Sequence, residues 1–151
     1  MEQRENSRFT VSVCDPSPPD LARTIAMVRR ALDGLPQGRR ASVRAYATSA
    51  ALLAGPPCHL CVTETALDGT DGFALARRVR ERQTGAAVIF VTGDAGDGTA
   101  RRAAECRAAG CLLKPLERPE DLERLRAMLD DSLRGAAPSA ACGGSSPISP
   151  K

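Results

Sequence analysis

The chain has 151 residues, of which 42% are hydrophobic, a size and composition typical of one globular domain with a substantial core. Trp is absent and aromatic residues make up only 3% of the chain, so there is no aromatic platform on which nucleic-acid bases could stack. The 21 basic and 18 acidic side chains give a net charge of +3, without a basic block that would follow a phosphate backbone. We therefore do not expect nucleic-acid binding.

The chain shows no signal for a membrane or for secretion. No apolar run approaches the roughly 18 residues that a membrane-spanning helix requires, and the first ten residues are polar and charged. We therefore predict a cytoplasmic protein without a membrane span. In the reducing cytosol, the six cysteines are expected to be free thiols.

Strand and helix patterns alternate along the chain. Short runs rich in β-branched residues predict strands, and apolar residues at helical spacing predict amphipathic helices between them. In chain order, the predicted elements are a strand over 9–14, a helix over 21–35, a strand over 41–46, a short helix from Thr48 or Ser49 through Leu53, a strand over 59–63, a helix over 73–82, a strand over 88–91, a helix over 99–109, a strand over 111–113 and a helix over 119–134. This order predicts an α/β fold: a single doubly wound, five-stranded parallel sheet, (β/α)5, with helices on both faces.

Several boundaries have specific signals. Asp20 is a plausible N-cap of the first helix, and Gly110 is expected to close the Ala-rich fourth helix. Residues 1–8 are expected to be a disordered N-terminus and 9–134 to be the folded domain. The Ser-, Gly-, Pro- and Ala-rich segment 135–151 buries too little to offset the entropy of ordering, and is expected to be a flexible tail.

Polar side chains follow several of the predicted strands at their carboxyl ends. Asp15 follows the first strand, Glu64 the third, Thr92 the fourth and Lys114 the fifth. In an open α/β sheet, ligands bind in the crevice outside the carboxyl ends of the strands. We therefore expect these four side chains to meet in one crevice.

The motifs around these positions resemble those of response-regulator receiver domains, a flavodoxin-like fold. The resemblance covers about residues 9 to 134, and rests on Cys14-Asp15 followed by Pro18, on Leu67-Asp-Gly-Thr-Asp-Gly72 before a helix, on Thr92-Gly93, and on Ala109-Gly-Cys-Leu-Leu-Lys-Pro115. It implies a protein of two-component phosphorelay signalling. It also implies a phospho-acceptor carboxylate at Glu64, a switching hydroxyl at Thr92 and a phosphate-binding cation at Lys114.

Two parts of that phosphorylation machinery are altered. The acid pair that the family uses to hold Mg²⁺ becomes Asp15 and Pro16, and the acceptor is Glu64, whose extra methylene moves its oxygens roughly 1.5 Å outward. A misplacement of about 1 Å can cost on the order of 10²-fold in rate. The family's aromatic switch position is Cys111. We therefore expect an atypical pseudo-receiver that is not an enzyme and needs no cofactor. Asp15 is expected to be either a ligand for weakly bound Mg²⁺ or a simple loop cap.

The role of Glu64 has two interpretations. Its carboxylate can reach toward Lys114 or Thr92 and partly mimic a phosphoaspartate, or it can be an inert partner that neutralises Lys114. Asp68 and Asp71 could be substitute acceptors, but Asp-Gly pairs are more typical of turns.

The resemblance implies a signalling surface on the helix after the fourth strand, the fifth strand and the last helix. The residues assigned to this surface are Arg101, Glu105, Leu112, Leu122 and Leu125. We expect a stand-alone receiver that binds a protein partner of a signalling pathway and forms a homodimer through this face. The alternatives are a phosphorylatable receiver with residual Mg²⁺-dependent acceptor activity, and a thiol redox sensor using Cys14 or Cys111.

Cys58 and Cys61 have the Cys-x-x-Cys spacing of zinc and thioredoxin sites. Zinc would need two further ligands, and His59 is the only histidine. As residues three apart entering a strand, the two thiols are expected to face opposite sides. The stronger interpretation is that both are small hydrophobic core residues.

Overall fold

The structure, a computed structural model, describes residues 9–36, 41–94 and 96–135. The predicted disordered start, 1–8, and the predicted tail beyond residue 135 lie outside the described residues. Within these three ranges, no helix is both long and apolar enough to cross a membrane.

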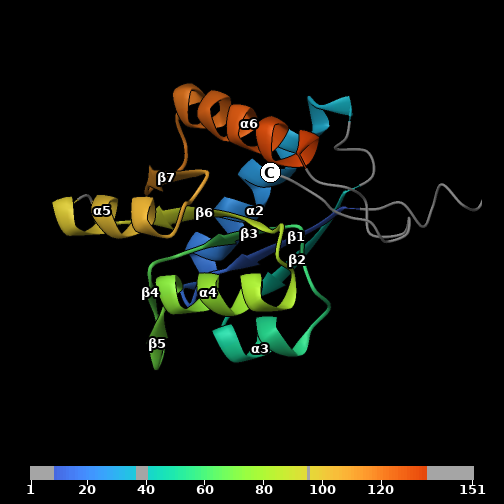
Figure 1. The fold of residues 1–151 in the computed structure, drawn as a ribbon. Helices are drawn as coiled ribbons and strands as arrows, with labels where there is room; N and C mark the ends of the chain where they lie inside the picture. The colour runs from blue at the N-terminus through green and yellow to red at the C-terminus, as the bar shows by residue number, and fades with distance from the viewer. Residues whose placement is uncertain (1–8, 37–40, 95, 136–151) are drawn as a thin grey trace, which may run out of the picture.

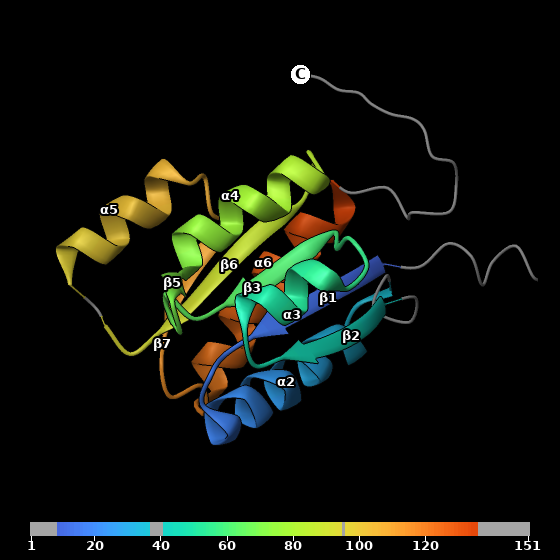
Figure 2. The same ribbon diagram turned by 90° about the horizontal axis from the view of Figure 1, so that it is seen from below.

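Five parallel strands form the central sheet in the order β2-β1-β3-β6-β7 (Figures 1 and 2). Their bounds are Phe9–Cys14 for β1, Ala41–Tyr46 for β2, Leu60–Thr63 for β3, Ala87–Thr92 for β6 and Gly110–Leu113 for β7. Each predicted strand is confirmed to within one residue at either end. Because the chain moves outward from β1 first to one edge and then to the other, the order reverses between β1 and β3, where doubly wound sheets open their ligand crevice.

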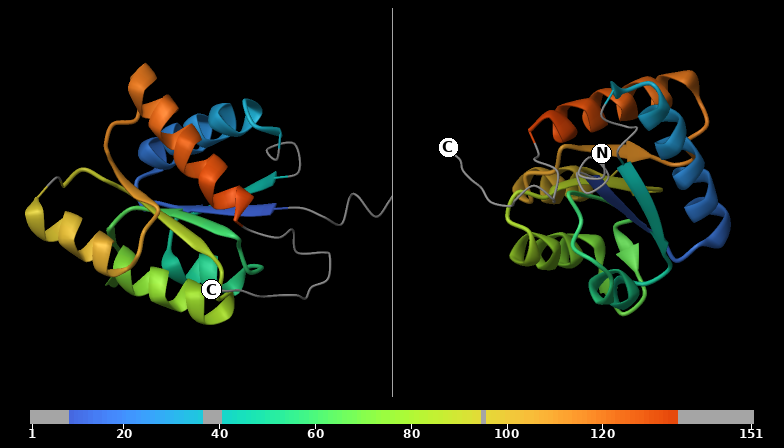
Figure 3. Two further views of the ribbon diagram at one scale, coloured as in Figure 1. Left: turned by 45° about the horizontal axis from the view of Figure 1, so that its top comes forward. Right: turned by 90° about the vertical axis from the view of Figure 1, so that its right-hand side faces the viewer.

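In the part of the chain that the structure describes, five helices cover the two faces of the sheet. They are α2, Pro18–Asp33; α3, Ser49–Ala54; α4, Gly72–Arg82; α5, Asp97–Glu105; and α6, Pro119–Arg134. Helices α2 and α6 pack together on one face, and α3, α4 and α5 lie on the other (Figure 3). The predicted flavodoxin-like (β/α)5 architecture is therefore confirmed.

Alternate residues of each central strand enter separate cores on the two faces. Val13 of β1 and Val91 of β6 pack beneath α2 and α6, whereas Cys14 and Phe90 pack beneath α3 and α4. Side chains alternate across a strand, so a sheet covered on both faces needs apolar residues in both sets. This explains why β3 and β6 are nearly continuous apolar runs, LCVT and AVIFVT.

The start of α2 differs from the prediction. Ser17 is the N-cap, and its hydroxyl accepts a hydrogen bond from the N–H of Asp20 at 3.4 Å. Pro18 and Pro19 fill the first helical positions, where a missing N–H costs no intrahelical hydrogen bond. The predicted N-cap at Asp20 is therefore wrong, and the Asp20 carboxylate is not used to cap α2.

Helix α5 ends four residues before the predicted end at Ala109. The N–H of Ala108 bonds to the carbonyl of Ala103 at 3.1 Å, while Arg107 adopts a left-handed conformation with φ 57°. This arrangement is a Schellman C-cap in which an arginine takes the position that glycine usually occupies. Gly110 is instead the first residue of β7. The sequence indicated Gly110 instead, because glycine is the residue by which a local sequence pattern marks such a cap.

The loop predicted between β3 and α4 contains a small hairpin. Strands β4, Ala66–Leu67, and β5, Thr70–Asp71, pair antiparallel through a turn in which Gly69 has φ 76°. Asp71 then caps α4, accepting the N–H of Ala74 at 2.8 Å. The hairpin and this cap support the interpretation of the aspartates here as turn and cap residues.

Cys58 and Cys61 do not face opposite sides as predicted. Both side chains are buried in the core beneath α3 and α4, with 2% and 0% exposure. The alternation argument failed because Cys58 precedes β3 and is not bound by the strand's period. Their interpretation as small core hydrophobes is consistent with this burial.

Candidate functional site

The four side chains expected in the crevice lie together at the carboxyl edge of the sheet. Asp15 follows β1, Glu64 follows β3, Thr92 ends β6 and Lys114 follows β7. Asp15, Glu64 and Thr92 are buried, at 3%, 8% and 2% exposure. The site is therefore a shielded polar cluster, in which charges interact more strongly than they would in water.

The ammonium group of Lys114 is the centre of this cluster. Its Nζ lies 2.7 Å from Asp15 Oδ2, 2.5 Å from Glu64 Oε1 and 3.1 Å from Asp20 Oδ2. The Lys114 side chain is only 14% exposed. One cation thus faces three carboxylates. Sequence reasoning missed Asp20; its position in the first turn of a helix that starts at the crevice was the available signal.

The second oxygen of Glu64 is held by the loop that follows it. Oε2 accepts hydrogen bonds from the N–H of Thr65 at 2.7 Å, the hydroxyl of Thr65 at 3.1 Å and the N–H of Ala66 at 3.2 Å. With Lys114 on its other oxygen, the carboxylate has four partners, which approaches its full hydrogen-bonding capacity. The Glu64 side chain is therefore oriented at both oxygens.

These contacts set the ionisation of Glu64. Burial alone would raise its pKa, but the Lys114 ammonium and the N–H groups of Ala66 and Thr65 outweigh burial and lower it below the ordinary value. The hydrogen bond from Lys114 also lowers the pKa of Asp20. The pKa of Lys114 is raised; burial opposes this, and the three acids overcome it. The lysine therefore remains protonated at neutral pH.

Thr92 is linked to Glu64 through a third residue. Its hydroxyl lies 2.9 Å from the hydroxyl of Thr65 and accepts the N–H of Asp94 at 3.1 Å. Thr65, a buried residue that sequence reasoning did not single out, thus connects the carboxylate to the threonine. A polar chain runs from Lys114 through Glu64 and Thr65 to Thr92.

The thiols of Cys14 and Cys111, near the crevice, have raised pKa values that disfavour redox chemistry. Burial raises the pKa of Cys14 to about 11 and also raises the pKa of the half-buried Cys111. Thiolates are the reactive form of cysteine, so both thiols are in the unreactive state at neutral pH. In the sheet register, Cys111 lies beside the fully buried Phe90.

Two residues assigned to the interaction surface are core residues. Leu112 of β7 and Leu125 of α6 are 1% and 0% exposed, because both side chains lie in the core between the sheet and the helices α2 and α6. Their assignment as contact residues is therefore wrong. Leu122 is partly buried against the same core, whereas Arg101 and Glu105 are exposed on α5.

The carboxylates of the crevice are the residues that a bound Mg²⁺ ion would use. Mg²⁺ requires near-octahedral oxygen ligands at 2.0–2.1 Å. Here Asp15, Asp20 and Glu64 converge on the Lys114 ammonium, and among the described residues no group of three potential ligands is placed to hold a metal. The side chains as arranged do not fit the ion, and Asp15 as a weak ligand stays a prediction.

The doubly wound sheet and this crevice define a receiver-type signalling domain, and comparisons agree. The family model of the response regulator receiver domain matches residues 20–128. The chain therefore belongs to the response regulator receiver domain family. No curated protein sequence matches the chain.

Solved structures show the same fold at low identity. The BeF3-activated receiver domain of DrrB, a response regulator of Thermotoga maritima, is 20% identical with a TM-score of 0.67, covering 84% of this chain and 98% of that one. A CheY-like receiver domain protein of Methanospirillum hungatei is 18% identical, with a TM-score of 0.64 and coverages of 86% and 100%. The isolated receiver domain of RcsB from Salmonella enterica, with phosphomimetic BeF3⁻, is 21% identical, with a TM-score of 0.64 and coverages of 82% and 89%.

Proposed function

We propose that this receiver domain acts in signal transduction through protein–protein contact without being phosphorylated, and that Glu64 partly mimics a phosphoaspartate. The observation that carries the proposal is the 2.5 Å ion pair between Glu64 Oε1 and Lys114 Nζ. This pair places a fixed negative charge on the cation that the family uses to bind phosphoryl oxygens. The other Glu64 oxygen satisfies the N–H groups of Thr65 and Ala66.

The same contacts oppose a role for Glu64 as a phospho-acceptor. Attack on a phosphoryl donor would lower the negative charge of the carboxylate and so weaken its contacts with Lys114 and the loop amides, and hydrogen bonds to charged groups contribute about 1.5–3 kcal/mol each. Residue 16, where the family has a second metal-binding acid, is a proline. A buried carboxylate that is held by four hydrogen-bond donors is a poor acceptor.

The mimicry is partial. A phosphoryl group carries about −1.5 to −2 charges and three acceptor oxygens, whereas a glutamate has one charge and two oxygens. Glu64 reaches Thr92 only through the Thr65 hydroxyl. The active-like arrangement would accordingly be favoured without being locked.

The proposed contact surface lies on α5, β7 and α6. Arg101 and Glu105 are exposed on α5, and Leu113 of β7 is 45% exposed, the one large hydrophobic side chain so exposed within the described ranges. One exposed leucine on a surface that also carries exposed charged side chains suits a protein contact with a small apolar centre. We propose that a partner protein or a second copy of the chain binds this surface.

The proposal is tested by titrating Mg²⁺ and beryllofluoride into the natural chain and a Pro16→Asp, Glu64→Asp variant, followed by amide NMR. We expect no response in the natural chain and shifts around residues 64, 92 and 114 in the variant. Such a result would place the loss of phosphate chemistry at those two positions. A saturable response in the natural chain would favour the alternative, a receiver with residual Mg²⁺-dependent acceptor activity.

A further inference from the structure

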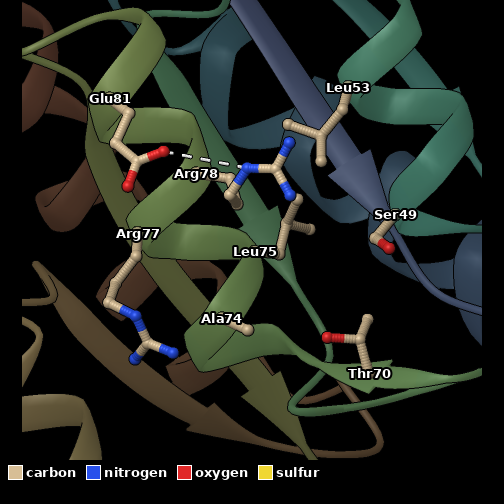
Figure 4. A pocket seen from close by; sticks show the side chains of 8 residues that line it. All are labelled: Ser49, Leu53, Thr70, Ala74, Leu75, Arg77, Arg78 and Glu81. Atoms are coloured by element: carbon tan, nitrogen blue, oxygen red, sulfur yellow. Dashed lines mark ion pairs between the residues drawn. The ribbon is translucent and has the colours of Figure 1, made fainter.

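A surface pocket lies between α3 and α4, away from the Glu64 crevice. Its volume is about 260 Å³, and Figure 4 shows its walls. Leu53 of α3 and Ala74 and Leu75 of α4 supply apolar surface, while Ser49 of α3 and Thr70 of β5 add hydroxyl groups. The pocket thus combines an apolar interior with polar groups at its margin, the usual composition of a binding site.

Two arginines of α4, Arg77 and Arg78, line this pocket, and their guanidinium groups are not needed to hold the fold together. Arg78 Nε lies 3.7 Å from Glu81 Oε1, and the two side chains are 63% and 71% exposed. An ion pair so exposed contributes little to stability, so the Arg78 guanidinium is available to another carboxylate. Arg77 is exposed and makes no ion pair with any residue of the described ranges.

The other two arginines of α4, Arg80 and Arg82, donate hydrogen bonds that stabilise the fold. Arg80 donates to the carbonyls of Ala86 and Arg107, at 3.1 and 3.0 Å, and also to that of Cys106. Arg82 donates to the carbonyls of Leu53 and Gly55, at 3.0 and 2.7 Å. Arg82 therefore ties the end of α4 to the end of α3 and holds the two walls of the pocket together.

We propose that this pocket is a docking site for an acidic segment of a partner protein, which inserts one apolar side chain between α3 and α4 and places carboxylates on Arg77 and Arg78. The volume suits one side chain, since it is below the roughly 300–1,000 Å³ of small-molecule sites. Guanidinium groups bind carboxylates through paired, charge-assisted hydrogen bonds. Charge complementarity thus selects an acidic partner.

A protein segment fits this surface better than a nucleic acid does. The residues that line the pocket include two cations, Arg77 and Arg78, which is fewer than the row of basic side chains that follows a phosphate backbone. Its lining residues include no aromatic side chain on which a base could stack.

The pocket is also separate from the surface proposed on α5, β7 and α6. Helix α4 stands between α3 and α5 (Figures 1 and 2). A partner seated in the pocket would leave α5 and β7 free. Binding in the pocket therefore does not depend on the state of Glu64. With a second partner on α5 and β7, the domain could bring two proteins together.

The test uses the full ¹⁵N-labelled chain and three acetylated pentapeptides: Glu-Glu-Leu-Glu-Glu, Glu-Glu-Ser-Glu-Glu and Lys-Lys-Leu-Lys-Lys. We expect the first peptide to shift amides of residues 49–53 and 70–78 saturably, and the other two to bind at least about tenfold more weakly. Equal binding of the serine peptide would show that no apolar side chain is inserted. Shifts elsewhere on the surface would also overturn the proposal.

Matched variants separate a specific site from general electrostatics. Arg77→Glu with Arg78→Glu is expected to weaken binding of the leucine peptide by about tenfold or more, whereas Arg29→Glu with Arg30→Glu, an equal change of charge at two exposed positions of α2, should alter it by less than about twofold. Ala74→Leu, which fills the pocket and keeps both arginines, should also weaken binding. Equal losses in the two double variants, or tighter binding of a ten-nucleotide poly-dT strand to the same amides, would contradict the assignment.

Discussion

The ammonium of Lys114 lies 3.1 Å from the carboxylate of Asp20, although 94 residues separate them in the chain. This contact joins the end of β7 to the first turn of α2. Residue 16, a proline, brings no carboxylate to the crevice, and Asp20 supplies one from four residues further along. Lys114 therefore balances three acids, and the local charge without it would be strongly negative.

Replacing this lysine should destabilise the fold. Lys114→Met leaves Asp15 and Glu64 buried and facing one another without a cation, which typically costs about 3–5 kcal/mol. Urea unfolding measures the loss. Asp20→Asn is the control, since the half-exposed Asp20 pair should contribute no more than about 1 kcal/mol. A loss of less than about 1 kcal/mol in Lys114→Met would contradict this account of the cluster.

The mimic and the inert-pair interpretations of Glu64 predict different results for Glu64→Gln. Both predict lower stability, because the amide presents donors to Lys114 and loses the charge. Only the mimic predicts that residues remote from the pair will respond. We expect amide shifts in α5 and β7, beyond the immediate neighbours of residue 64. Shifts confined to residues 63–66 and 114 would support the inert pair.

Stability should fall in acid. The pKa values of Glu64 and Asp20 are lower in the folded chain, so below pH of about 4.5 the unfolded chain binds more protons and the free energy of unfolding decreases. Lys114 has a raised pKa, so its contribution is present at every pH below about 10.4 and is lost only above that value. Urea unfolding between pH 3 and 9 measures the profile. Glu64→Gln should make the acid decline shallower; an unchanged slope would contradict the assignment.

Two glycines provide a matched pair of substitutions. A Cβ at Gly72 would collide with the backbone carbonyl oxygen of Glu64, whereas a Cβ at Gly110 would meet the end of the Met128 side chain. Met128 is flexible and can move aside, but the loop after β3 cannot without displacing Glu64. We expect Gly72→Ala to cost about 1–3 kcal/mol and Gly110→Ala clearly less. Thermal unfolding of both variants checks the order, and a reversed order would contradict it.

Strands were easier to predict than helix ends. The central strands β3 and β6 are buried on both faces, so their sequences are short apolar runs that local composition makes visible. The end of α5 depends instead on Arg107 adopting a left-handed conformation while Arg80 bonds its carbonyl. No local pattern signals that a distant arginine will support such a cap.

The residues of the candidate site also differ in whether the local sequence reveals them. Glu64, Thr92 and Lys114 could be named because each directly follows or ends a recognisable strand, and parallel strands end at the same edge. Asp20 and Thr65 were missed. The contact of Asp20 with Lys114 depends on where α2 begins, for which its place in the first helical turn was the one signal, and the role of Thr65 depends on how the loop after β3 turns.

The sequence by itself determined the order of the elements, the sheet with helices on both faces and the polar residues at the strand ends. These features follow from the spacing of hydrophobic residues along the chain and from where each strand ends. Only the tertiary structure decided which of those side chains touch. The number of acids that share Lys114, the link from Glu64 through Thr65 to Thr92, and the burial of Leu112 and Leu125 all depend on how elements pack. Distances between side chains on separate elements are set by packing, and local sequence does not encode them.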